Sequence, residues 1–139
     1  MTITRAIAAA MLAGLAVGAA STAWADPPTL NGHYVRTVTN AKGQAVTNDW
    51  YFTPCGDGCA QLTTPQAAQA QLVNGQWTMD LVSDAVCPDG STVPAARRAH
   101  YMWDPNTLAG TVQITVNVAA CGEAVGQIGT AKLQLKQAP

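Results

Sequence analysis

The chain is poor in charge and in aromatic residues. Only 11% of its 139 residues are charged, 6% are aromatic, and the formal net charge is −1. An average globular domain has about 25% charged residues. So weak a charge offers no electrostatic surface for nucleic acid, and we expect no nucleic-acid partner. Nor does any apolar run reach the roughly 18 residues of a membrane-spanning helix, so we expect no membrane span after export.

Residues that carry catalysis are also scarce. The chain has two histidines, His33 and His100, one glutamate, Glu123, and only two serines after residue 25, Ser83 and Ser91. The histidines lack the spacing of a metal motif, and neither serine lies in a nucleophile elbow. The sequence therefore predicts no catalytic residue, no metal ligand and no bound cofactor.

The first 25 residues have the pattern of an export signal. Arg5 precedes an apolar, alanine-rich stretch over residues 7–20, and small residues stand at Ala23 and Ala25. This arrangement is typical of a secretory signal peptide with its cleavage site. The prolines that begin at Pro27 cannot continue a helix. We expect a signal peptide over residues 1–25 and a single secreted domain over residues 26–139.

The four cysteines fit an exported protein. An even number of cysteines in an oxidising compartment predicts two disulfides, for which three connectivities exist. Cys55 and Cys59 flank a short loop with two glycines, which permits a local bridge, and this leaves Cys87 to pair with Cys121. The spacing is neither the C-x2-C of redox motifs nor that of a zinc site. We therefore interpret the bridges as structural.

The rest of the chain alternates between apolar and polar residues and is interrupted by turns. An Asn74-Gly75 pair marks a hairpin, because both positions of its turn need a positive φ. Thr64 and Pro65 could begin one short helical turn over residues 66–70. Strands are predicted over residues 33–39, 44–53, 59–64, 76–83, 95–103, 108–118 and 132–137. With the short run before Asn74, we expect an all-β fold of about seven or eight short antiparallel strands, either a sandwich or a small barrel.

Large rings fall at strand positions. Trp50, Trp77, Tyr101 and Trp103 all lie in or beside predicted strands. Such rings dominate small hydrophobic cores, which is the simplest interpretation. The alternative is that the four rings line a ligand pocket.

Several of these segments carry a resemblance. Residues 50–59, 74–77, 87–90, 101–110 and 121–122 combine tryptophans, turns and cysteines. Together with the alanine-rich signal, they resemble a group of small exported proteins of mycobacteria (actinobacteria) with no assigned activity. The resemblance implies a disulfide-stapled β-domain that is secreted or held in the cell envelope. It implies no catalytic residue.

Two functions remain open at this point. The first is a non-enzymatic binding or interaction module whose partner is an envelope lipid, glycan or protein. The second is a small extracytoplasmic hydrolase that uses a pair of carboxylates. Two facing carboxyl groups would favour the hydrolase, and an aromatic cavity would favour the binding module.

The export signal gives the first prediction. Exported protein should begin at Asp26, because Ala23 and Ala25 form the cleavage site and two prolines follow it. N-terminal sequencing of protein from the culture medium measures this directly. Exported protein that still carries Met1 would contradict the prediction.

Overall fold

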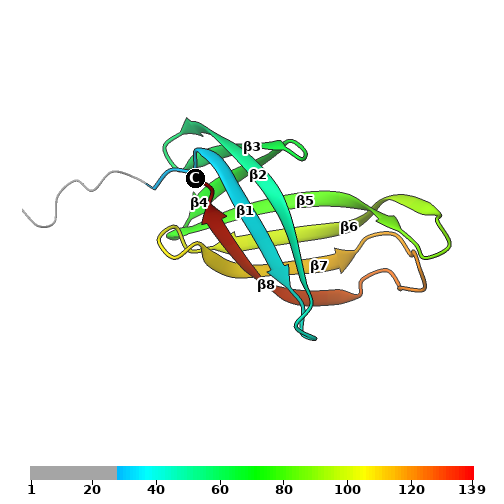
Figure 1. The fold of residues 1–139 in the computed structure, drawn as a ribbon. Helices are drawn as coiled ribbons and strands as arrows, with labels where there is room; N and C mark the ends of the chain where they lie inside the picture. Colours follow the sequence, from blue (N-terminus) through cyan, green and yellow to red (C-terminus); the bar gives the residue numbers. More distant parts are fainter. Residues whose placement is uncertain (1–27) are drawn as a thin grey trace, which may run out of the picture.

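The computed structural model describes residues 28–139, so the predicted signal peptide lies outside the described residues. This part of the chain folds into strands alone and contains no helix that could cross a membrane. The strands are β1 (Gly32–Thr39), β2 (Ala45–Gly56), β3 (Cys59–Thr64), β4 (Ala68–Val73), β5 (Gln76–Val86), β6 (Thr92–Trp103), β7 (Ala109–Val116) and β8 (Ile128–Gln137). Each strand pairs antiparallel with the next, as Figure 1 shows.

The strands close into a barrel. β1 pairs with β8 from Tyr34 opposite Gln137 to Thr39 opposite Lys132. This pairing joins the first strand to the last, so every strand has two neighbours. The all-β, antiparallel prediction is confirmed, and of its two alternatives the barrel is correct. Closure also removes the exposed edges that a sandwich would retain.

The segment after Pro65 differs from the helical turn considered for residues 66–70. It leads into β4, which pairs with β3 on one side and β5 on the other. Ala70 points into the barrel and is fully buried. Two flanking strands and a buried position outweigh the local helical preference of alanine and glutamine. The hairpin at Asn74-Gly75 is confirmed, with φ of 51° and 80°.

Aromatic rings fill the interior. The ring of Trp50 lies 5.0 Å from Tyr101, 5.9 Å from Phe52 and 6.2 Å from Trp103, measured between centroids. Edge-on and tilted contacts at these distances are favourable for aromatic pairs. An eight-stranded barrel is just wide enough for side chains to fill. Leu30, in the segment before β1, is also buried in this core.

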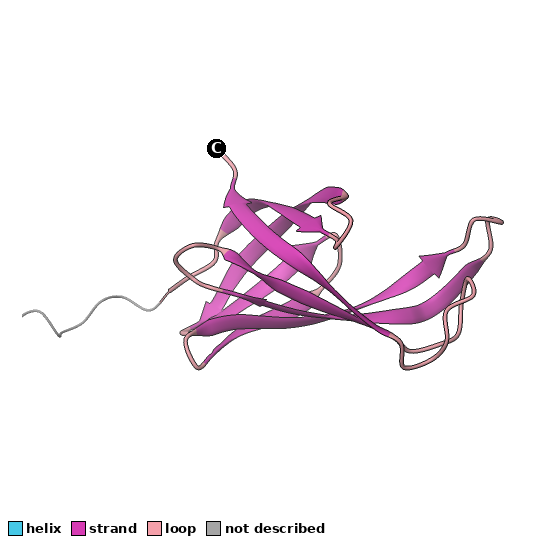
Figure 2. Ribbon diagram, turned by 90° about the horizontal axis from the view of Figure 1, so that it is seen from below, coloured by secondary structure: helices cyan, strands magenta, loops and turns pink. Residues whose placement is uncertain are grey.

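Four barrel strands continue beyond the others and form an arm. β4 pairs with β5 only as far as Met79, whereas β5 and β6 stay paired out to Val86 and Thr92. Figure 2 shows this sheet projecting from the barrel. We define the arm as residues 80–86, 92–100, 113–116 and 128–131, together with the turns that join them.

Both predicted disulfides are present. Cys87 joins Cys121 and so ties the β5–β6 turn to the β7–β8 connection at the end of the arm. Cys55 joins Cys59 across the β2–β3 turn. The arm has only a small core of its own, centred on Ala85, Ala96 and Ala120. The long-loop bridge, which contributes about 4 kcal/mol in the chain-entropy description, compensates for so little apolar packing.

The strand predicted over residues 108–118 is shorter in the structure. Its alternation predicts that Val112, Ile114, Val116 and Val118 share one buried face. β7 spans Ala109–Val116, and Val112 and Val116 are buried as this pattern predicts. Ile114, expected to be buried with them, is only half-buried, because it lies where the barrel opens into the arm. Val118 lies beyond the strand and is 45% exposed.

Close packing around Gly110 gives the second prediction. Gly110 pairs with Trp103, and a Cβ at this position would lie 2.6 Å from the Cα of Trp103 and closer still to the carbonyl oxygen of Met102. Gly110→Ala should therefore lower the free energy of unfolding by about 1–3 kcal/mol or more. Urea denaturation measures the loss.

Gly129→Ala is the matched control. Gly129 also lies in a strand, and a Cβ there would meet nothing within 4 Å. Its effect should stay within about 0.5 kcal/mol. Equal losses of unfolding free energy in the two variants would show that the replacement of a strand glycine as such, and not the close approach at Gly110, causes the loss.

Candidate functional site

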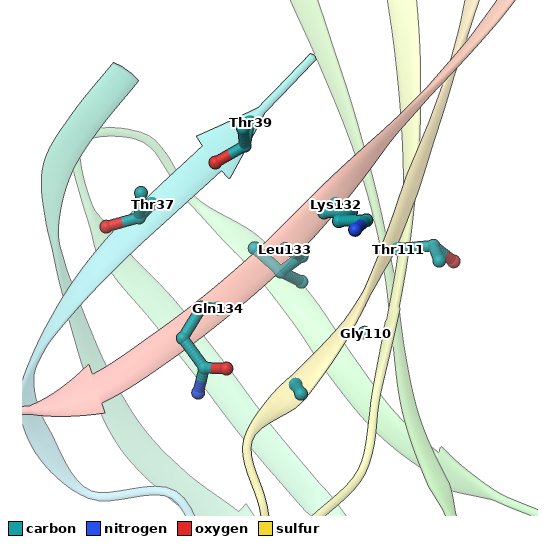
Figure 3. Close-up of a pocket in the computed structure, with 8 residues that line it drawn as sticks. Thr37, Thr39, Gly110, Thr111, Lys132, Leu133 and Gln134 are labelled. Atoms are coloured by element: carbon teal, nitrogen blue, oxygen red, sulfur yellow. The ribbon is translucent and has the colours of Figure 1, made fainter. Parts of the chain in front are cut away.

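One outer groove of about 450 Å³ runs over β8 between β1 and β7 (Figure 3). Its lining residues are Thr37, Thr39, Ala109, Gly110, Thr111, Lys132, Leu133 and Gln134. The amide of Gln134 already donates to the carbonyl oxygens of Thr107 and Leu135. The groove is open and offers one charged group, Lys132. These features are those of the solvated face of a sheet.

A second outer groove, of about 420 Å³, crosses β5, β6 and β7. Its lining residues are Asp80, Arg98, His100, Gln113, Thr115 and Asn117. Nδ1 of His100 lies 2.8 Å from Oδ1 of Asp80, and Nε of Arg98 lies 3.8 Å from the same oxygen. The basic groups of this groove therefore already pair with Asp80, so neither needs a ligand as a counter-charge.

A third hollow, which we call the mouth hollow, lies where the barrel opens toward the arm. It has a volume of about 190 Å³ and collects side chains from β1, β2, β5 and β6 and from the turn between β3 and β4. The lining residues are Arg36, Asn48, Trp50, Pro65, Gln66, Leu81, Ser83, Ala99 and Tyr101. It brings a cation, two aromatic rings and several polar groups to one place.

Arg36 dominates the mouth hollow. Its guanidinium carbon lies 5.4 Å from the ring centre of Trp50 and 5.6 Å from that of Tyr101, within reach of cation–π attraction. Nη2 donates to the hydroxyl of Tyr101 at 3.2 Å, and Nη1 donates to the side-chain oxygen of Asn48. Two rings and two hydrogen bonds hold this group in one orientation.

The charge of Arg36 has no anionic partner within residues 28–139. Its Nε atom is buried and has no hydrogen-bond acceptor there. Arg97, on the inner face of the arm, provides the contrast, because its guanidinium lies 2.6 Å from the carboxylate of Glu123. A half-buried cation without a counter-charge is costly. The mouth hollow therefore contains a positive charge that no acidic side chain of residues 28–139 neutralises.

The structure separates the four rings that the sequence suggested for a ligand pocket. Trp50 and Tyr101 line the mouth hollow. Trp77 and Trp103 are as buried as Trp50, at 1% and 0% exposed, but do not line this hollow. The four therefore do not line one cavity. All four belong to the core that fills the barrel, and Trp50 and Tyr101 also form the floor on which Arg36 lies.

Sequence reasoning did not single out Arg36. The signal was present in the alternation of β1, where Tyr34, Arg36 and Val38 share one face. Tyr34 is buried and Val38 packs against the core, so that face points into the barrel. A cation at the middle position of an inward face is unusual in a strand. This position could have been recognised as a candidate before the structure was known.

The histidines and most carboxylates serve local contacts. Nε2 of His33 lies 2.8 Å from Asp49 on the neighbouring strand, and the ring of His33 stacks on Tyr51. Backbone N–H groups of Thr107 and Asn106 lower the pKa of Asp104, which they hold in the β6–β7 turn. Within residues 28–139, no group of three histidine, cysteine or acidic residues forms a metal site.

Comparison with known proteins adds no identification. No family model, no curated protein and no solved structure matches the chain. The function is therefore argued from the mouth hollow itself.

The unpaired charge gives the third prediction. Arg36→Met keeps the apolar stem that packs on the rings and removes a charge whose burial is unfavourable. The free energy of unfolding should therefore change by no more than about 1 kcal/mol, measured by urea denaturation. Leu133→Ala, at a core position that is 2% exposed, should lose about 2–5 kcal/mol. An equal loss in Arg36→Met would show that Arg36 serves the fold.

Proposed function

We propose that this protein is an exported, non-enzymatic binding module that holds a negatively charged group of its ligand at Arg36. The observation that carries the proposal is the half-buried guanidinium of Arg36, oriented by Trp50, Tyr101 and Asn48 and lacking any carboxylate partner in residues 28–139. An anion in the mouth hollow would supply the missing counter-charge.

The donors of Arg36 suit such a ligand. A guanidinium has five N–H groups in a planar fork. Each Nη atom carries two of them and donates one within the described residues, to Asn48 or to Tyr101. One N–H on each Nη atom therefore remains for a ligand. Paired donors of this kind bind carboxylate or phosphate oxygens with good geometry.

The bridges and the sequence of residues 1–25 support an extracytoplasmic compartment. Two disulfides and no free cysteine in the described chain are consistent with an oxidising, extracytoplasmic location. The signal-like segment at residues 1–25 supports secretion or retention in the cell envelope. The resemblance to small exported mycobacterial proteins supports the same placement. A lipid, a glycan or a protein of the envelope could each supply the anionic group.

The placement of the carboxylates supports a binding role over hydrolysis. Asp49, Asp80 and Glu123 each pair with a histidine or arginine, and Asp84 accepts the backbone N–H of Ala95. A carboxylate-dependent hydrolase needs two such groups facing a common substrate. Here the partners are different basic or backbone groups on separate parts of the barrel and arm.

A titration with a matched pair of small molecules gives the fourth prediction. Butyrate at low salt should shift the NMR signals of the Trp50 indole and the Asn48 side-chain amide, whereas butyramide, its neutral analogue, should not. Arg36→Gln should weaken butyrate binding at least about tenfold, because it removes a charge-assisted pair of hydrogen bonds.

Arg98→Gln is the matched control for net charge. Arg98 lies on the outer face of β6, and its side chain is 58% exposed. Its removal should leave butyrate binding within about twofold of the parent protein, because exposed charges contribute little at a distance. Equal responses to butyrate and butyramide, or an unchanged affinity in Arg36→Gln, would contradict the proposal.

A further inference from the structure

The mouth hollow is too small for a whole ligand. Pockets that enclose a small molecule measure roughly 300–1,000 Å³, and this one measures about 190 Å³. Packed rings of Trp50, Phe52, Tyr101 and Trp103 block the way further into the barrel. A ligand whose anionic group reaches Arg36 must therefore extend outward, over the inner face of the arm.

That face is apolar next to Arg36. Leu81, Ala99 and Ile114 lie side by side on three adjacent strands, since Ala99 pairs with both of the others. All three are only half-buried and pack against the core from its open side. Val116, two residues further out on the same face of β7 and itself buried, continues the row. We call these four residues the apolar trough.

Another hollow, distinct from the two outer grooves, lies at the far side of the trough, and we call it the second hollow. It has a volume of about 200 Å³ between β6, β7 and β8, and both Ile114 and Val116 line it. The mouth hollow includes Leu81 and Ala99. Direct pairing of Ala99 with Ile114 therefore makes the two hollows neighbours on one surface. Arg97 also lines the second hollow, but Glu123 neutralises its charge.

From this arrangement, and resting on the proposed function, we infer that the ligand is a single-chain carboxylate amphiphile. Its carboxylate binds Arg36, and its apolar chain lies across the trough toward the second hollow. The neighbouring strands are about 4.8 Å apart, so the three-strand row alone spans about 10 Å. A chain lying along this row would remove the exposed parts of Leu81, Ala99 and Ile114 from water.

The head group is assigned from charge balance. One guanidinium matches one carboxylate in charge and in its pair of donors. A phosphate monoester carries about −1.5 to −2 charges at neutral pH, which Arg36 alone would leave partly uncompensated. Among the other residues that line the mouth hollow there is no second cation. The site therefore favours a monocarboxylate over a phosphate monoester.

The test is a chain-length series, which is also the fifth prediction. Calorimetric titrations below the critical micelle concentration compare butyrate, octanoate and dodecanoate with dodecanol and dodecyl phosphate. If the chain lies in the trough, affinity should rise by up to about fourfold for each added methylene, the value for full burial, until the trough is filled. Dodecanoate should bind more tightly than both dodecanol and dodecyl phosphate.

Two variants locate the chain. Ile114→Thr keeps a β-branched residue in β7 but places a hydroxyl in the trough, so the gain from butyrate to dodecanoate should shrink at least about tenfold while butyrate affinity stays the same. Thr115→Val, next in sequence and on the opposite face, should leave the whole series unchanged. The series in the unmodified protein tests the inference even if Ile114→Thr does not fold.

The outcomes separate the two proposals. Butyrate binding that does not increase with chain length would overturn the amphiphile inference and leave the proposed function intact. Tighter binding of dodecyl phosphate would overturn the choice of carboxylate alone. Binding of dodecanol equal to that of dodecanoate, or no binding of any anion, would overturn the proposed function and the inference together.

Discussion

The filling of the barrel by aromatic rings is the constraint on which the rest of the structure depends. Trp50 contacts Phe52, Tyr101 and Trp103, and these rings occupy the space that the closed sheet encloses. Such packing is the main source of stability in a small domain with few charges. It also removes the internal cavity in which a barrel of this size could hold a ligand. A ligand site is therefore to be sought at the mouth of the barrel and not in its interior.

At Arg36, the packed rings of the barrel also form a candidate binding site. The same rings that fill the barrel present their faces to its guanidinium at 5.4 and 5.6 Å. They stabilise the cation without neutralising it, because an aromatic face attracts positive charge but is not an anion. A carboxylate on a neighbouring strand would have satisfied the charge permanently, as Glu123 does for Arg97. Its absence from the described contacts keeps the charge available to a ligand.

The arm extends that site outward. β5 to β8 continue past the pairing of β4 and β1, so their inward face leaves the enclosed core and becomes half-exposed at Leu81, Ala99 and Ile114. The arm packs few apolar residues of its own, and the Cys87–Cys121 bridge holds its two outer connections together. A covalent constraint of this kind replaces the hydrophobic core that so thin a structure cannot form.

By itself, the sequence determined the all-β class and the Asn74-Gly75 hairpin, and it indicated both disulfides. The first two follow from alternation of period two and from the positive φ of a tight turn. The disulfides follow from the short loop with two glycines that permits a bridge between Cys55 and Cys59, which leaves Cys87 to pair with Cys121. Only the tertiary structure decided that the sheet closes, that residues 68–73 form a strand, and that Arg36 lies on Trp50 and Tyr101. Closure and the contacts of Arg36 depend on strands that are remote in sequence, and β4 depends on pairing with both of its neighbours, β3 and β5. A period-two pattern indicates which face a residue occupies but not which strand lies opposite it.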